Sequence, residues 1–414
     1  MDIDELLKAW QKDPEFIRNT TCWQQSPPVA AAFEPLPENI PVQLLSNLRQ
    51  KGITQLYSHQ AQALNRISTG EHLVISTGTA SGKTLCYDIP VVQTLIQEQS
   101  ARALYLFPTK ALAQDQLRLL NELCAAPGGS LRPLPAIYDG DTPPNHRAEI
   151  RRIAEIIITN PDMLHQGILP HHTLWRQFFA GLRYVVVDEM HTYRGVFGSH
   201  VANVIRRLKR VAAFYQAYPQ FILTSATIGN PTELAEKLIE SPVVLIDQDG
   251  SPHGKRHFLV YNPPLVNEQL GLRASSLQTG IHFTRKLLSS GIQTLVFARS
   301  RRSVEMILTY LYDAIPRGMR AQIRGYRSGY LKGDRREIEA GFKEGSIKAV
   351  VATSALELGI DIGSLESVIL VGYPGSIATT RQRAGRAGRR QQASLAMFIA
   401  SPEAMDQYLA NHPE

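Results

Sequence analysis

The stretch "TGTASGKT" has the residue types that bind nucleotide phosphates. Small side chains let successive backbone N–H groups close around a phosphate, and a lysine and a hydroxyl residue can reach the terminal phosphates and Mg²⁺. Lys83 is the expected phosphate ligand and Thr84 the expected metal ligand. Because Thr77 stands where this motif usually begins with glycine, Gly78 is expected to supply the turn. The predicted nucleotide-binding residues of this loop are Thr77, Gly78, Thr79, Ala80, Ser81, Gly82, Lys83 and Thr84.

A pair of acids follows in "YVVVDEMH", residues 184–191. The apolar run predicts a strand that delivers Asp188 and Glu189 to its carboxyl end, where ligands of open α/β sheets bind. Asp188 can hold Mg²⁺ through its water shell, and Glu189 can polarise the attacking water. Taken alone, the two acids could instead cap the next helix. Together with the phosphate loop upstream, they predict hydrolysis of ATP with Mg²⁺ as cofactor.

Two arginines near the end of the chain could complete such a site. Arg386 and Arg389 stand three residues apart in "QRAGRAGR", which predicts that they share one face of a helix. Each guanidinium offers paired donors to a γ-phosphate, and an arginine finger of this kind raises the rate by roughly 10³–10⁵. The alternative is a solvated or nucleic-acid-binding basic helix, the role expected for Arg381, Arg383 and Arg390.

The elements that position these residues are predicted from alternation of short apolar β-branched runs with helical patterns, which is typical of parallel α/β sheets. The expected strands cover residues 72–77, 103–109, 155–160, 184–189, 221–227, 242–247, 294–300, 321–327, 348–354, 367–374 and 395–401. The set divides into two similar α/β domains, 56–246 and 281–414. A polar linker, 247–280, is expected between them, and a Pro-rich segment, 1–55, is expected to pack on the first domain.

Composition narrows the class of protein. The chain has 414 residues, of which 43% are hydrophobic, which is typical of a globular protein, and no apolar run approaches the roughly 20 residues of a membrane span. The acidic, amphipathic start "MDIDELLKAWQKD" indicates neither a secretory signal nor a transit peptide. Cys22, Cys86 and Cys124 match no zinc spacing, so we expect buried thiols in a reducing compartment. The net charge of +7 suggests a polyanionic partner, but only weakly.

The motifs resemble, in their order, those of the superfamily 2 DEAD/DEAH-box helicases, over roughly residues 50 to 400. The further matching segments are "LYSHQ" (56–60), "FPTKALAQDQ" (107–116), "TNPDML" (159–164), "TSAT" (224–227), "LVFARSR" (295–301), "ATSALELGIDIG" (352–363) and "RQRAGRAGRR" (381–390). The stretches "DEMHTYRGVFGSHVANVIRRLKR" and "YNPPLV" resemble the YprA branch, which includes mitomycin-repair-factor-type DNA helicases. The resemblance implies two tandem RecA-like domains with parallel sheets and an ATP site in the cleft between them.

The resemblance also implies roles for single residues. Gln60 is assigned to recognition of adenine, with Tyr57 as a stacking partner, and Gly359 and Asp361 to nucleotide and interdomain contacts. His191 is expected to connect the Mg²⁺ acid to "TSAT" rather than to bind a metal, because no second His or Cys stands at ligand spacing.

Nucleic acid is expected to be held mainly by its phosphates, through backbone N–H groups and short polar side chains that directly follow strands. Arg299 could instead be a surface charge and Asn160 a turn residue, and the pair His171–His172 is expected to be a loop feature. The predicted nucleic-acid-binding residues are Thr109, Lys110, Asn160, Arg299, Thr353 and Ser354.

The predicted function is an ATP-dependent helicase or translocase acting on single-stranded or partly duplex nucleic acid. DNA is favoured over RNA, in repair or recombination, in the cytoplasm (on the nucleoid in a bacterium) and without a membrane partner. The alternative is an ATP-gated protein that binds and remodels RNA without processive unwinding; a strand-separating β-hairpin would distinguish the two, and the sequence does not reveal one. A small-molecule kinase is disfavoured because it needs no second motif-bearing domain.

One departure from the resembled family concerns the end of the chain. Family members usually carry a further C-terminal region with a four-cysteine zinc cluster, and residues up to Glu414 contain no such cluster. We therefore expect a truncated chain or a minimal relative, which weakens the expectation of processive unwinding.

Overall fold

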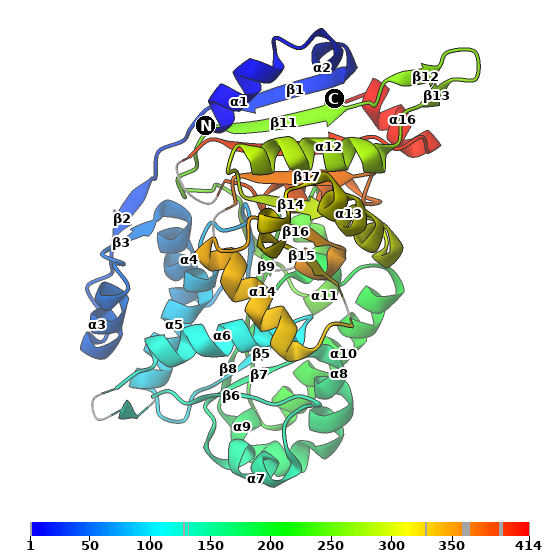
Figure 1. Ribbon diagram of the computed structural model, residues 1–414. Helices are drawn as coiled ribbons and strands as arrows, with labels where there is room; N and C mark the ends of the chain where they lie inside the picture. The colour runs from blue at the N-terminus through cyan, green and yellow to red at the C-terminus, as the bar shows by residue number, and fades with distance from the viewer. Residues whose placement is uncertain are drawn as a thin grey trace. The chain divides into compact units, whose positions relative to one another are not determined.

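The computed structural model describes residues 2–126, 129–130, 132–327, 329–357, 365–388 and 392–413. The chain divides into two compact units (Figure 1). The first unit is Ala31–Ser251, and the second unit combines Met1–Ala30 with Pro252–Glu414. Each unit is built on one seven-stranded sheet. The predicted α/β class is therefore confirmed, and every strand expected from the sequence is present.

The sheet of the first unit is parallel throughout, in the order β10-β4-β9-β8-β5-β7-β6. All residues of β4 and β7 are buried, as expected for strands covered on both faces. The strands are β4 Leu73–Ser76, β5 Arg102–Leu106, β6 Pro135–Ile137, β7 Ile156–Thr159, β8 Leu182–Val187, β9 Gln220–Ser225 and β10 Val244–Ile246. A separate two-stranded sheet pairs β2 Phe33–Pro35 with β3 Gln55–Tyr57.

Helices connect these strands, as parallel pairing requires. They are α3 Val42–Gln50, α4 Ser58–Ser68, α5 Lys83–Gln97, α6 Lys110–Leu123, α7 Pro144–Ile153, α8 Pro161–Met163, α9 Arg176–Ala180, α10 Gly195–Phe214 and α11 Pro231–Ile239. His171 and His172 lie in a 3₁₀ segment, Leu169–Trp175, rather than in the expected loop. His172 is held there because its Nδ1 lies 2.9 Å from the hydroxyl of Tyr215 on the neighbouring α10–β9 connection.

The sheet of the second unit has the order β1-β11-β18-β17-β14-β16-β15. Only its first pair, β1 with β11, is antiparallel. The strands are β1 Thr20–Ser26, β11 Arg256–Tyr261, β14 Thr294–Phe297, β15 Ile323–Tyr326, β16 Ala349–Ala352, β17 Ser367–Val371 and β18 Ser394–Ile399. The helices are α1 Ile3–Trp10, α2 Pro14–Asn19, α12 Ser276–Ser289, α13 Arg301–Ala314, α14 Lys332–Glu344, α15 Ile377–Ala384 and α16 Ala404–Asn411. Among the helices described in either unit, none is both long and apolar enough to cross a membrane.

The structure differs from the sequence prediction in how the chain is divided. Residues 1–30 belong to the second unit, whereas we expected the N-terminal segment to pack on the first domain. The expected linker, 247–280, contains β11, a strand inside the second sheet, and the β-hairpin of β12 Leu265–Asn267 and β13 Leu272–Arg273. The reason is that β1, with its polar sequence, finds its hydrogen-bonding partner in β11.

An aromatic cluster holds the N-terminal helices on the second unit. The side chain of Trp10 on α1 is 5% exposed, and its ring centroid lies 5.3 Å from that of Phe16 and 5.1 Å from that of Phe283. Asp2 caps α1 together with Glu5, so the helix begins where its apolar face starts. The N-terminal segment is thus a part of the second hydrophobic core.

We therefore predict that Trp10→Ala lowers the unfolding free energy of the second unit by about 3–5 kcal/mol, because it empties a packed aromatic site. The measurement is hydrogen exchange of the backbone amides in β11 and β18, with β8 and β9 as internal reference. Ile17→Ala, at a side chain that is 45% exposed on α2, is the matched control and should have little effect. Equal protection losses in the two sheets would contradict the assignment of residues 1–30 to the second unit.

Candidate nucleotide and nucleic-acid site

The phosphate loop joins β4 to α5 in the first unit. Two residues take positive φ angles, Ala80 at 63° and Gly82 at 80°. The backbone angle at Gly82 favours glycine, and a Cβ atom there would lie 2.6 Å from Nε2 of Gln60, so a larger residue would also displace the Gln60 amide. Ala80 has no such freedom, and its left-handed conformation is a local strain of the kind that collects at binding sites.

Hydrogen bonds inside the loop hold its lysine in place. The Lys83 ammonium donates to the carbonyl oxygens of Thr77 at 3.0 Å and Gly78 at 2.6 Å. The Thr77 and Ser81 hydroxyl oxygens lie 2.6 Å apart, and Ser81 also donates to the Gly78 carbonyl. Burial lowers the pKa of Lys83, and the charges of Glu189 and Asp188 oppose that shift. The cation is thus positioned in the loop and opposite the two acids before any phosphate arrives.

Asp188 and Glu189 follow β8 directly, at the carboxyl edge of the sheet. The Thr224 hydroxyl at the end of β9 donates to Oδ1 of Asp188, and the backbone N–H of Glu189 donates to the Thr224 hydroxyl at 3.4 Å. Burial raises the pKa of Asp188 to about 6, with a smaller contribution from the neighbouring charge of Glu189. Glu189 itself has φ of 50°, so the catalytic candidate sits in a strained backbone conformation.

His191 joins the acids to the "TSAT" segment, as expected. The Ala226 N–H donates to Nδ1 of His191 at 3.2 Å, and the Glu189 carboxylate lies 3.4 Å from the same nitrogen. The Ser76 hydroxyl, at the end of β4, donates to the Ala226 carbonyl at 3.2 Å. One network therefore runs from the strand of the phosphate loop through "TSAT" to the acids.

The donor set near the loop fits Mg²⁺ carried by a nucleotide. Among the residues with described placement, no three His, Cys, Asp or Glu side chains cluster in a way that could hold a metal by themselves. Mg²⁺ is usually bound by one or two protein oxygens together with substrate phosphates and water. Thr84, in the first turn of α5, and Asp188 are the side chains that would hold it here.

Gln60, which the resemblance assigns to adenine, is buried and connects two elements. Its Oε1 accepts the Tyr57 N–H at 2.9 Å, and its Nε2 donates to the Gly82 carbonyl at 2.9 Å. The Tyr57 ring stacks with Phe33, at 5.4 Å between centroids, and with His59, at 6.0 Å. Sequence reasoning missed Phe33, which the pairing of β2 with β3 places opposite Tyr57. A short exposed aromatic strand in a Pro-rich segment offered no pattern that would have identified it.

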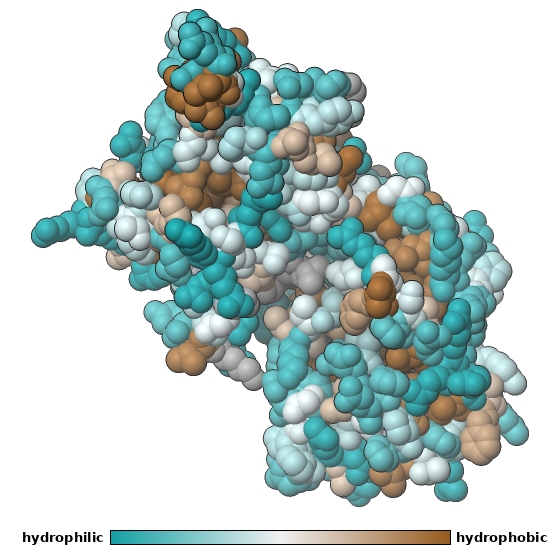
Figure 2. Space-filling model, turned by 90° about the vertical axis from the view of Figure 1, so that its right-hand side faces the viewer, coloured by the Kyte–Doolittle hydropathy of each residue, from teal (hydrophilic) through white to brown (hydrophobic). Residues whose placement is uncertain are grey.

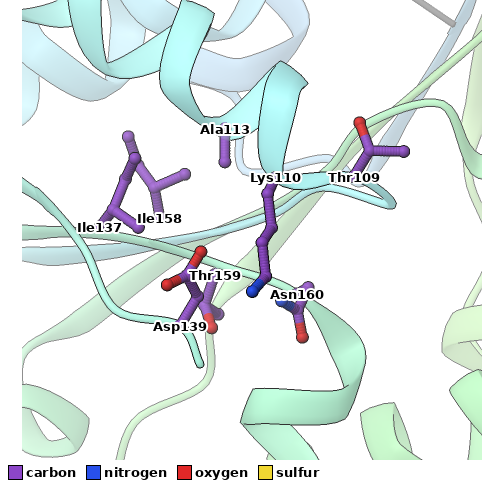
Figure 3. Close-up of a pocket in the computed structure, with 8 residues that line it drawn as sticks. All are labelled: Thr109, Lys110, Ala113, Ile137, Asp139, Ile158, Thr159 and Asn160. Atoms are coloured by element: carbon purple, nitrogen blue, oxygen red, sulfur yellow. The ribbon is translucent and has the colours of Figure 1, made fainter. Parts of the chain in front are cut away.

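The three predicted strand-contact residues of the first unit line one pocket (Figure 3). Thr109 and Asn160 follow β5 and β7, which are neighbours in the sheet, and their side chains cap α6 and α8. Lys110 extends between them, and its Nζ donates to Oδ1 of Asp141 at 2.7 Å. That bond raises the pKa of Lys110. The other lining residues are Ala113, Ile137, Asp139, Ile158 and Thr159.

Sequence reasoning also missed the acidic loop at this pocket. Asp139 is buried, and its Oδ1 accepts the N–H of Asp141 at 2.8 Å, which directs the second acid toward Lys110. Two acids around one glycine in "DGDT" were the available signal. The pocket therefore offers polar groups that can bind a phosphate, and its lysine, Lys110, is held by the carboxylate of Asp141.

In the second unit, the predicted strand contacts also lie at the carboxyl edge of their sheet. Arg299 follows β14, while Thr353 and Ser354 follow β16, its parallel neighbour. The Arg299 guanidinium pairs with both carboxylate oxygens of Glu403, and its side chain is 41% exposed. One nucleic-acid strand that crosses this edge of the sheet can thus contact all three residues.

The arginine-rich segment differs from the prediction. Arg386 does not lie on a helix, because α15 ends at Ala384 and the following glycines, Gly385 and Gly388, favour a turn, with φ of 92° at Gly388. The Arg386 side chain is 2% exposed and donates to the backbone carbonyl of Glu357.

Arg383 is buried rather than solvated, which corrects its predicted role as a solvated or nucleic-acid-binding arginine. It donates to Oε2 of Glu357 at 3.2 and 2.9 Å, and its guanidinium lies 4.9 Å from the ring centre of Phe297. Arg381 is exposed. Gly359, Asp361, Arg389 and Arg390 lie outside the described residues.

Residues 57–234 match the DEAD/DEAH box helicase model, and residues 279–391 match the helicase conserved C-terminal domain. The chain belongs to the superfamily 2 DEAD/DEAH-box helicases. It is 50% identical over 397 residues to an uncharacterized ATP-dependent helicase, YprA, of Bacillus subtilis, a match that covers 96% of this chain and 53% of the relative.

Two further relatives place this helicase chain within the superfamily. It is 41% identical over 365 residues to ATP-dependent helicase HRQ1 of Saccharomyces cerevisiae, over 86% of this chain and 34% of the relative. It superimposes on the crystal structure of the DUF1998 helicase MrfA bound to DNA with a TM-score of 0.94 at 49% identity, covering 100% of this chain and 55% of that chain. This helicase chain therefore spans about half the length of such relatives.

Lys83→Ala is predicted to reduce nucleotide turnover by at least about 10²–10³-fold, because the variant lacks the cation held inside the phosphate loop. The measurement is phosphate release at saturating Mg²⁺ and ATP, with circular dichroism to confirm the fold. Lys237→Ala is the control, since that side chain is exposed on α11 of the same unit. Hydrolysis at the wild-type rate in folded Lys83→Ala would remove the phosphate-loop assignment.

A buried carboxyl beneath the loop has a pH-dependent effect on stability. Asp88 on α5 accepts hydrogen bonds from Gln116 Nε2 on α6, at 2.8 Å to each oxygen, and from the Tyr105 hydroxyl on β5, at 3.0 Å. Burial nevertheless raises the pKa of Asp88 to about 7. A raised folded-state pKa gives stability that is complete below the ordinary carboxyl pKa and is lost as the pH rises toward about 7.

Asp88→Asn should therefore flatten the pH dependence of unfolding. From about pH 4 to about pH 7 the wild type loses unfolding free energy as Asp88 ionises, and the neutral variant lacks this loss. Urea titrations of both proteins at each pH measure the difference, with Glu236→Gln, at an exposed carboxyl on α11, as the control. A gap between wild type and Asp88→Asn that stays constant with pH would show that Asp88 does not change its charge in this range.

Proposed function

We propose that this chain is the ATP-hydrolysing motor of a DNA helicase, an enzyme that couples ATP hydrolysis to movement on nucleic acid. The observation that carries the proposal is the network that joins Asp188 to Thr224, and through His191 to Ala226. It lies in the same unit, and at the same edge of the sheet, as the pocket formed by Thr109, Lys110 and Asn160. An ATPase without a nucleic-acid partner has no need for that second pocket.

In this mechanism the chain's own residues hold the nucleotide and the water. Lys83 exchanges the loop carbonyls for the β- and γ-phosphates. Thr84 and Asp188 would hold Mg²⁺, and the ion would neutralise charge on the phosphates. Glu189 polarises the attacking water. Thr224 contacts both Asp188 and the Glu189 backbone, so a change at the acids is transmitted to the end of β9.

The second unit supplies the remaining groups. We assign Arg386 to the γ-phosphate, as an arginine finger, together with Arg389; Gly359 and Asp361 are assigned to nucleotide and interdomain contacts. Burial of the Arg386 guanidinium supports a fixed orientation rather than a solvated charge. Gln60 and Tyr57 are assigned to the adenine.

DNA is the favoured partner, single-stranded or partly duplex, with repair or recombination as the setting and the cytoplasm as the location. A relative with 49% identity is described as bound to DNA, and another structure of it as bound to DNA and AMPPNP. The net charge of +7 agrees with a polyanionic partner.

A β-hairpin in the second unit favours unwinding over the alternative, clamping of RNA without unwinding. The hairpin of β12 and β13 follows β11, so it leaves the sheet at the same carboxyl edge as Arg299. Its base is fixed by reciprocal hydrogen bonds between the side chains of Asn262 and Gln407, at 3.0 and 3.1 Å. Figure 1 shows that the hairpin extends away from its sheet. In Figure 2, which views the molecule from that side, hydrophobic residues form small patches among hydrophilic ones.

The hairpin carries apolar side chains where a soluble protein usually places polar ones. Val266 is 68% exposed and Leu270 69% exposed, and Leu265 and Leu272 are also exposed. Apolar side chains at a strand junction can replace the stacking partner of the last base pair. We assign the hairpin to that separation.

The first test of the function is the ATPase rate without nucleic acid, with single-stranded DNA and with RNA of matched length. We expect the strongest stimulation by DNA. Lys110→Ala should weaken DNA binding and reduce the magnitude of its salt slope by roughly 0.7, as for one lost phosphate contact. Arg118→Ala, an exposed arginine on the same helix, is the control. Equal rates under all three conditions would contradict a nucleic-acid motor.

The second test separates unwinding from translocation. A Val266→Ser, Leu270→Ser variant should lose most strand displacement on a partly duplex DNA and keep its DNA-stimulated ATPase rate, because the hairpin is remote from the nucleotide loop in sequence and contributes no predicted phosphate contact. Val42→Ser, at a side chain that is 84% exposed on α3, serves as the control. Unwinding by the double variant at the wild-type rate would contradict the role of the hairpin.

A further inference from the structure

The last residues of the first unit, Asp249 to Ser251, are attached to the phosphate loop. The backbone N–H of Gly78 donates to Oδ2 of Asp249 at 3.2 Å. The other carboxylate oxygen accepts the N–H of Ser251 at 2.9 Å, which fixes the orientation of the side chain. The chain enters the second unit at the next residue, Pro252. A carboxylate on the phosphate loop thus lies two residues from the end of the unit.

The same segment is also packed against the start of α4, the helix that carries Gln60. The Gly250 N–H donates to Nδ1 of His59 at 3.2 Å. A Cβ atom on Gly250 would lie 2.2 Å from the hydroxyl oxygen of Ser58 and 2.9 Å from its backbone nitrogen, so only glycine fits. The segment therefore has no freedom to slide while Ser58 and His59 stay in place.

The other connection between the units is tied to the same point. The Ala32 N–H donates to the Gly250 carbonyl at 3.0 Å, and the Ala32 carbonyl accepts the Ser58 N–H at 2.8 Å. Ala32 lies directly after the first crossing of the chain, between residues 30 and 31. Both segments that leave the first unit therefore meet at Gly250, next to Asp249.

The charged groups around Asp249 indicate what would break the hydrogen bond between its carboxylate and the Gly78 N–H. Its positive neighbour is Lys83. Burial lowers the pKa of Lys83, and the charge of Asp249 opposes that shift together with those of Glu189 and Asp188. His59 supplies no second positive charge: burial lowers its pKa, and its Nδ1, which lies 3.9 Å from Asp249, accepts the Gly250 N–H. Nucleotide phosphates engaging Lys83 would bring several negative charges to the vicinity of the Asp249 carboxylate, which would then be repelled.

We propose that Asp249 is a positioning residue that senses the nucleotide: it holds the phosphate loop through Gly78 and is displaced by the phosphates of ATP, which releases the segment leading out of the first unit. The inference rests on the proposed function only in that ATP binds this loop. Displacement costs binding free energy, so Asp249 lowers the affinity for ATP. By reciprocity, the same free energy couples nucleotide binding to the segment.

Asp249→Asn removes the charge with little change of shape; its single amide oxygen can still accept the Gly78 N–H, at the loss of the bond from the Ser251 N–H. We expect the full chain to bind Mg²⁺ with a non-hydrolysable ATP analogue about tenfold more tightly than wild type, with a smaller gain for ADP because ADP carries less charge. Asp247→Asn is the matched control, since this exposed neighbour has no described contact with the loop. Asp249→Glu keeps the charge and should retain weak ATP binding, and Asp249→Ser replaces the asparagine variant should that one not fold.

A second readout separates coupling from simple repulsion. In the wild type the affinity for single-stranded DNA should differ between nucleotide-free and analogue-bound protein, and in Asp249→Asn this difference should shrink. Equal gains for ATP and ADP in Asp249→Asn, or an ATP affinity that is unchanged or weakened, would overturn the proposal. So would a difference in DNA affinity in Asp249→Asn that is as large as the wild-type difference. Failure of the wild-type chain to bind ATP would instead overturn the proposed function.

Discussion

Parallel pairing of β4, β9 and β8 is the constraint on which the site depends. In that register Ile75 lies opposite Thr224, and Val187 lies opposite Leu223, so the residues that follow the three strands emerge side by side. The Thr224 hydroxyl therefore meets Asp188, and the Ser76 hydroxyl meets the Ala226 carbonyl, without any long connection. A shift of one residue in β9 would turn Thr224 toward the opposite face of the sheet and break the link between the phosphate loop and the acids.

The site keeps several charges near one another before any nucleotide binds. Lys83 stands among Asp188, Glu189 and Asp249, and burial disfavours the charged form of both Lys83 and Asp188. Such an arrangement persists only because the surrounding sheet is packed on both faces and each group has hydrogen-bond partners. The positive φ angles in the loop and at Glu189 add strain at the same place. Unfavourable electrostatic and backbone energies are thus concentrated in the first unit at the place where a charged ligand and its metal ion would relieve them.

The second unit shows that sequence order and structural order can differ. Its sheet contains β11, and β11 carries on its outer edge β1, from the start of the chain. The N-terminal helices bring Trp10 and Phe16 to the same core as Phe283. As a result the chain crosses between the units twice, and in the first unit the segments beside both crossings meet at Gly250. The two segments that enter and leave the first unit are therefore held together at one point.

Local sequence determined most strands of the two sheets, the phosphate loop and the acids, because each depends on residues close together in the chain: an apolar run, a glycine at positive φ, a carboxylate directly after a strand. The order of the helicase motifs likewise determined the family. Tertiary structure decided what depends on distant partners. Thr20–Ser26 is polar and becomes a strand only because β11 offers an edge, and Arg386 leaves the predicted helix because Gly385 and Gly388 turn the chain toward Glu357. Phe33, Asp141 and Asp249 gained their places opposite Tyr57, Lys110 and Gly78 through pairings across the fold, and no spacing within the sequence encodes those meetings.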